Sequence, residues 1–140
     1  MDLNIQNQIK DYIKSYEWEF SQEQEFSQGH EFLIRFLGEI SNTEFHLIIN
    51  VENEWISFTI WPYLPAIPKE KQIESLTLLC SHNYGMKLAR FGITDDGVVA
   101  LCIDLPVDGL NERTFHLALN VISYYADNLY SDFIILWNEN

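Results

Sequence analysis

The chain has 140 residues, of which 47% are hydrophobic and 21% charged, the balance of an ordinary globular protein rather than a disordered one. We therefore expect a single domain that spans residues 1–140. With 8 basic and 21 acidic residues, the formal net charge is −13, and a field of this sign repels phosphate groups. The charge argues against nucleic acid and anionic membrane surfaces as partners. It is compatible with simple solubility or with a basic protein partner.

The two cysteines, Cys80 and Cys102, do not form a CxxC pair. Both fall on predicted apolar faces, so we expect both to be buried and reduced, as in a cytoplasmic protein. The first residues lack a basic segment followed by an apolar one, and no apolar run approaches the ~20 residues of a membrane span. The sequence thus predicts neither a signal peptide nor a transmembrane helix.

Residues 3–16 carry apolar side chains at helical spacing and predict an amphipathic helix. Residues 17–31 contain five glutamates and no lysine or arginine. The aromatic residues of this segment occupy even-numbered positions, and the glutamates occupy odd-numbered positions. This pattern fits either an acidic edge strand or an extended loop.

Residues 30–61 predict an antiparallel meander of three strands, closed by two-residue loops at Ser41-Asn42 and Asn53-Glu54. The expected pairs are Phe36 with Leu47, Ile34 with Ile49, Phe32 with Val51, Val51 with Ile56, Ile49 with Phe58 and Leu47 with Ile60. Both registers gather large apolar side chains on one face of the sheet. The opposite face is mixed and holds Leu33, Arg35, Leu37, His46, Ile48, Asn50, Trp55, Ser57, Thr59 and Trp61.

Residues 62–68 contain three of the four prolines and predict a stiff crossover. Pro68 is suited to open a second helix, and Gly85 to close it. The apolar stripe of this helix is expected to consist of Ile73, Leu76, Cys80 and Tyr84.

Residues 86–105 predict a second hairpin around Asp95-Asp96-Gly97. A three-residue loop would pair Ile93 with Val99 and Phe91 with Leu101. A two-residue loop would separate these bulky side chains, so we favour the longer loop.

The clearest helical pattern begins after Asn111, a suitable N-cap. Its core stripe consists of Phe115, Ala118, Leu119, Ile122, Tyr125, Ala126 and Leu129. The apolar tail, residues 133–137, fits either a final strand or an extension packed on the sheet. The order α-β-β-β-α-β-β-α predicts an α+β fold, an antiparallel sheet with its helices mainly on one face.

The second half carries a resemblance to a known family. Its segments are Leu79-Cys80-Ser81-His82-Asn83-Tyr84-Gly85, Leu88-Ala89-Arg90-Phe91-Gly92-Ile93, Asp95-Asp96-Gly97, Asp104-Leu105-Pro106 and Tyr125-Ala126-Asp127. Together they resemble the YbjN-like family of bacterial sensory-transduction regulators. The resemblance implies a fold like that of type III secretion chaperones and a protein-binding or regulatory role, often as a dimer. It carries over no catalytic residues. Of the paired asparagines that this resemblance places at the exit of the second helix, only Asn83 is present.

No motif for phosphate-binding loops, serine hydrolases or zinc proteases is present in the sequence. Cys80 and His82 are two residues apart on a predicted helix, so they point to different faces and do not form a nucleophile and its base. Glu44 and His46 share a strand face, but two or three ligands do not define a metal site. We therefore predict no enzyme activity, no cofactor and no metal.

The mixed sheet face is the best functional candidate. We expect Leu37, Ile48, Trp55 and Trp61 to form a protein-binding surface, because so large an apolar patch is unusual on a monomer. Two alternatives stay open: the first helix, residues 17–26 or the tail covers this face, or a homodimer buries it.

The sequence thus predicts a non-catalytic protein-binding or regulatory module, chaperone-like, with an unidentified client. The alternative is an acidic inhibitor or immunity-type protein that blocks a basic enzyme through electrostatic attraction.

Overall fold

The computed structural model describes residues 3–18, 22–26 and 29–139. The chain forms the elements α1 (Leu3–Ser15), β1 (Gln22–Phe26), β2 (Gly29–Gly38), β3 (Thr43–Glu52), β4 (Trp55–Ile60), the short 3-10 helix η1 (Lys69–Lys71), α2 (Gln72–Gly85), β5 (Arg90–Ile93), β6 (Val99–Pro106) and α3 (Glu112–Asn138). The predicted order is confirmed, with one further strand, β1, before the meander. Of the two interpretations of residues 17–31, the edge strand holds for residues 22–26.

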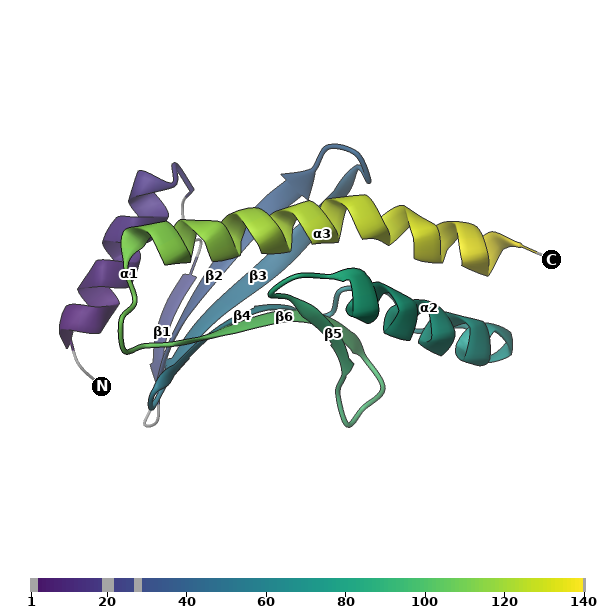
Figure 1. Cartoon of the computed structure of the whole chain (residues 1–140), viewed down its shortest axis with the longest axis horizontal. Coiled ribbons are helices and arrows are strands. Elements are labelled where there is room, and N and C mark those ends of the chain that lie inside the picture. The colour runs from purple at the N-terminus through teal and green to yellow at the C-terminus, as the bar shows by residue number, and fades with distance from the viewer. Residues whose placement is uncertain (1–2, 19–21, 27–28, 140) are drawn as a thin grey trace.

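The six strands form one antiparallel sheet in the order β1-β2-β3-β4-β6-β5. The helices lie on one side of the sheet, and α3 runs across it (Figure 1). The helix α1 lies near the N-terminal end of α3, and α2 lies beside the C-terminal half of α3. The core fills the space between sheet and helices. Its largest fully buried side chains include Phe32, Leu47, Ile49, Ile56, Phe58, Ile60, Leu101, Phe115 and Phe133. The predicted α+β fold with helices mainly on one face is therefore confirmed.

Two of the three predicted hairpin registers are confirmed. Val51 pairs with Ile56 across β3 and β4, and Phe91 pairs with Leu101 across β5 and β6. The register of β2 and β3 is wrong by two residues, since Phe36 pairs with Phe45 instead of Leu47. The loop contains four residues, 39–42, because backbone N–H groups within it bind a side chain of α3. A shift of two residues preserves parity, so the core face keeps the predicted residues.

The predicted orientation of α2 is wrong. Ser75 and Leu79 are its buried residues, whereas Ile73 is 78% exposed and Tyr84 is 94% exposed. Cys80, expected in the core, is also exposed. The helix carries apolar residues on several sides, and its contacts with α3 decide which side is buried. Pro68 precedes η1 rather than opening α2, and Gly85 ends α2 as expected.

The tail is neither a strand nor a separate extension, because α3 continues to Asn138. Asn111 caps the start of this helix: its side chain accepts a hydrogen bond from the backbone N–H of Thr114 at 3.0 Å. Near the other end, Phe133 is fully buried and packs edge-on against Phe91, with ring centroids 5.8 Å apart. Continued core packing on the same helical face explains why the helix does not stop earlier.

Candidate functional site

The face of the sheet that points away from the helices is the candidate functional site, and we call it the outer face. Strand alternation sends Ser57 and Thr59 of β4 outward, while Ile56, Phe58 and Ile60 enter the core. Within the described residues, none of the helices packs on this face. Of the alternatives left open for this face, cover by α1 or by the tail does not occur, since Ile9 and Ile13 of α1 and Phe133 of α3 belong to the core.

An apolar row crosses the middle of the outer face. The strand registers align Leu33 with Ile48, Ile48 with Thr59, Thr59 with Cys102, and Cys102 with Arg90. Each of the first four side chains is half-buried by its cross-strand neighbours. The side chains of this row are therefore held in position by their neighbours and present a partly exposed apolar surface to a partner.

Burial raises the pKa of the Cys102 thiol in this row, and the nearby Arg90 guanidinium opposes part of that rise. A raised pKa lowers the thiolate fraction near neutral pH, and the thiolate is the nucleophilic form. Cys102 is thus suited to packing rather than to covalent chemistry.

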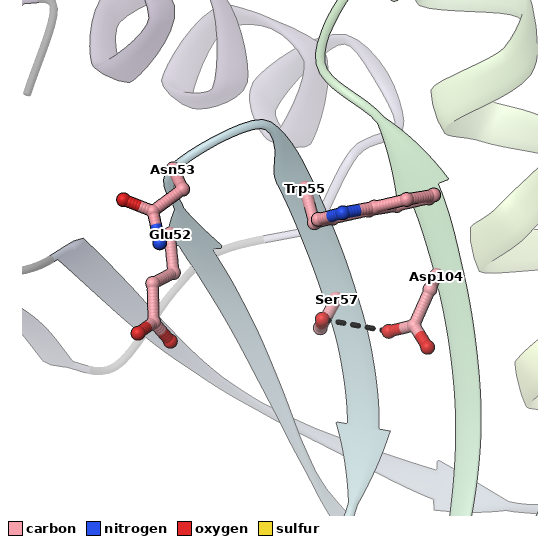
Figure 2. Close-up of a pocket in the computed structure, with 5 residues that line it drawn as sticks. All are labelled: Glu52, Asn53, Trp55, Ser57 and Asp104. Atoms are coloured by element: carbon pink, nitrogen blue, oxygen red, sulfur yellow. Dashed lines mark hydrogen bonds between the residues drawn. The ribbon is translucent and has the colours of Figure 1, made fainter.

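A polar row runs beside the apolar one, and its groups bind one another. Ser57 donates a hydrogen bond to Asp104 Oδ1 at 2.7 Å, and Arg90 Nη2 lies 2.7 Å from Asp104 Oδ2. Figure 2 shows the Ser57–Asp104 pair at the floor of a shallow hollow bordered by Glu52, Asn53 and Trp55. Because the carboxylate is held by a hydroxyl and a guanidinium, it is a fixed acceptor rather than a free general base.

At the far end of the outer face, His46 pairs with Glu44 of the same strand, with 3.3 Å between Nε2 and Oε1. Both side chains are about half exposed, so the pair is a solvated one. No third ligand joins them: among the described residues, no group of three His, Cys, Asp or Glu side chains is placed to hold a metal ion.

The four predicted site residues share the outer face but do not form one patch. Trp55 is 54% exposed and lies beside the polar row, and Leu37 is 60% exposed and pairs with Glu44. Ile48 is half-buried in the apolar row. Trp61 is 39% exposed just beyond the end of β4. Polar side chains separate these apolar ones, so a partner would meet an alternating surface.

Sequence reasoning missed the polar row. Ser57 and Asp104 are far apart in the chain and meet only because β4 pairs with β6. A predicted pairing of β4 with β6 would have revealed it, because that pairing places Ser57 opposite Asp104 and Thr59 opposite Cys102.

Two other histidines have structural roles. His82 of α2 lies 3.2 Å from Asp132 of α3 and packs against Phe133, whereas Cys80 faces outward, so the two are separated as expected. His116 Nε2 lies 3.0 Å from the Tyr12 carbonyl oxygen at the end of α1. Both histidines thus connect α3 to a neighbouring helix.

The described part of the chain contains no helix that is both long and apolar enough to cross a bilayer. A search of curated protein sequences finds no match to the chain. A family model does match: YbjN, described as "Putative bacterial sensory transduction regulator", over residues 6–134. This match includes most of α1, the whole sheet and most of α3, and so covers most of the chain. The chain therefore belongs to the YbjN family.

Proposed function

We propose that this protein is a single-domain, non-catalytic regulatory module that binds a protein client through the outer face of its sheet, in the manner of a chaperone. The observation that carries the proposal is the outer face itself, on which none of the described helices packs. Its half-buried apolar row crosses four of the six strands, β2, β3, β4 and β6, and Trp55, Leu37 and Trp61 are exposed around this row. Aromatic side chains of this kind often dominate the binding energy of interfaces.

Membership of a family of sensory-transduction regulators supports a regulatory role. The polar groups on the outer face also favour binding over catalysis, because Asp104 is already bound by Ser57 and Arg90. Such satisfied groups can form a polar rim around apolar contacts without a large desolvation cost.

The test is capture of the client with Trp55→Ala plus Trp61→Ala. Wild-type protein should retain a defined protein, identified by mass spectrometry, and the double variant should lose it. The matched control is Leu117→Ala, which removes a 50% exposed apolar side chain from α3, on the other side of the molecule. Equal retention by the double variant and the wild type would reject the outer face as the binding surface.

A second candidate is an acidic inhibitor or immunity-type protein with a basic target. The net charge of −13 favours it, and Glu44 and Glu52 bring exposed carboxylates to the outer face. Electrostatic steering predicts an association rate that falls steeply as salt is added. An association rate insensitive to salt would remove this candidate.

A homodimer through the outer face is the third arrangement. Sedimentation velocity separates it from client binding, because the dimer should form in the purified protein alone and should dissociate in the Trp55→Ala plus Trp61→Ala variant.

A further inference from the structure

A line of exposed apolar side chains runs along α2 on the side opposite its buried residues. Ile73 is 78% exposed, Leu76 is 43% exposed and Tyr84 is 94% exposed, with the exposed Cys80 between them. Spacings of three and four residues place these side chains in one row, which we call the α2 stripe. The row has no partner within the described part of the chain, although apolar helix faces are normally buried.

The apolar surface continues from the α2 stripe toward α3. A shallow groove lies between α2 and α3, which are side by side in Figure 1. It is lined by Ile73, Thr77, Leu78 and Ser81 of α2 and by Leu136 of α3. Glu74 is the charged residue that borders this groove. A helix laid along α2 could therefore bury the stripe and insert side chains beside α3.

The charge around α2 differs from that of the rest of the chain. Residues 69–90 contain four of the eight basic residues and two of the 21 acidic ones, a net charge of +2. Since the whole chain carries −13, the remaining residues carry −15. The basic character is therefore concentrated beside the exposed apolar row.

The lysines of this region are available to a partner. Lys69 and Lys71 precede α2, and Lys87 follows it. None of the three forms an ion pair within the described residues, whereas Arg90 is engaged by Asp104. The positive end of the α2 dipole lies beside Lys69 and Lys71 and strengthens the attraction for carboxylates there.

We propose that the α2 stripe is a docking site for an acidic amphipathic helix of a partner protein. Its apolar face would pack on Ile73, Leu76 and Tyr84, and its flanking carboxylates would meet Lys69, Lys71 and Lys87. A basic helix would be repelled by these lysines. A second copy packed α2 against α2 would bring lysines toward lysines. The site lies apart from the outer face, so it stands or falls independently of the proposed function.

The probe is a pair of synthetic amphipathic helical peptides with the same leucine face, one flanked by glutamates and the other by lysines. Fluorescence anisotropy should give the acidic peptide a dissociation constant below about 100 μM and the basic peptide one at least about tenfold weaker. Lys69→Glu plus Lys71→Glu should weaken the acidic peptide by about tenfold or more and remove its salt dependence. Leu76→Ala should weaken it by roughly fivefold or more, whereas the exposed-leucine control Leu117→Ala should not.

The reactivity of Cys80 reports whether the α2 stripe is covered, because its exposed thiol lies within the stripe. In a Cys102→Ser background, the acidic peptide should slow the reaction of Cys80 with an aromatic disulfide reagent. Failure of the acidic peptide to bind, equal binding of both peptides, or binding that leaves Cys80 unprotected would each overturn the proposal. A dimer in sedimentation velocity that Leu76→Ala dissociates would overturn it as well, because a second copy would then be the occupant.

Discussion

Asp127 of α3 approaches β2 at a position where only a glycine, Gly38, leaves room for it. A Cβ added to Gly38 would lie 2.4 Å from Asp127 Oδ1. The same carboxylate accepts hydrogen bonds from the backbone N–H groups of Ser41 at 2.8 Å and Ile40 at 3.2 Å. The absence of a Cβ at Gly38 thus allows α3 to bind the β2–β3 loop, although the two segments are far apart in the sequence.

Gly38→Ala should therefore destabilise the protein by about 1–3 kcal/mol, because either the new methyl or the carboxylate must move. The matched control is Gly92→Ala, where an added Cβ meets nothing within 4 Å. That variant should stay within about 0.5 kcal/mol of the wild type. Chemical denaturation measures both, and equal losses would show that the close approach to Asp127 is not what Gly38 provides.

The hydrogen bonds to Asp127 also predict a pH dependence. Partial burial acts to raise the pKa of this carboxyl, but the N–H groups of Ser41 and Ile40 outweigh it and hold the pKa below its ordinary value. A group with a lowered folded pKa stabilises the protein above its unfolded pKa, about 3.9, and this contribution is lost as the pH falls through the folded pKa.

Asp127→Asn should accordingly be less stable than the wild type near neutral pH, and the difference should shrink below about pH 3.9 as the wild-type carboxyl becomes protonated. Denaturation curves of the two proteins at a series of pH values test this. The other carboxyls titrate in both proteins, so their contributions cancel in the difference between the two free energies of unfolding. A difference that stays constant down to acid pH would contradict the role given to the charge.

The β2–β3 loop illustrates what could and could not be predicted from the sequence. Alternation of apolar residues identified the core face of every strand of the meander, since parity is a local property. The register of β2 and β3 was wrong because the carboxylate of Asp127, far along the chain, binds Ser41 and lengthens the loop. At Asn53-Glu54 the backbone N–H of the distant Val107 donates to the Glu54 carbonyl oxygen at 2.8 Å without lengthening the loop, and the two-residue loop was predicted correctly.

The orientation of α2 could not be predicted for a related reason. Its apolar residues lie on more than one side, so their spacing did not identify the buried face. Packing against α3 decides it: Trp137 Nε1 donates a hydrogen bond to the buried Ser75 hydroxyl at 2.9 Å. The exposed α2 stripe is the side that this contact leaves uncovered. The candidate outer face was located by parity, while its polar row depended on the pairing of β4 with β6.

Asn83 should prove structural. Its side-chain amide donates to the Phe91 carbonyl oxygen at 3.1 Å and accepts from the Phe91 N–H at 2.7 Å, as a neighbouring strand would. The residue thus closes the outer edge of β5, where unpaired backbone groups invite association. Asn83→Ala should cost about 1–2 kcal/mol.

Hydrogen exchange provides the local readout of that variant. The Phe91 amide should exchange faster in Asn83→Ala, while amides in the central strands β3 and β4 should change only as much as the global stability does. Unchanged protection of the Phe91 amide would contradict the edge-closing role of Asn83.

The two cysteines should differ strongly in reactivity. The Cys80 thiol is exposed on α2, whereas Cys102 is half-buried in the apolar row of the outer face, where burial raises its pKa. Access therefore favours Cys80, and the raised pKa of Cys102 lowers the reactive thiolate fraction of that thiol. At about pH 8, close to the ordinary thiol pKa, Cys80 should react with an aromatic disulfide reagent at least about tenfold faster. The single variants Cys80→Ser and Cys102→Ser assign the two rates. Equal rates would mean that the strands around Cys102 open readily, and the outer face could not then serve as the fixed binding surface proposed for it.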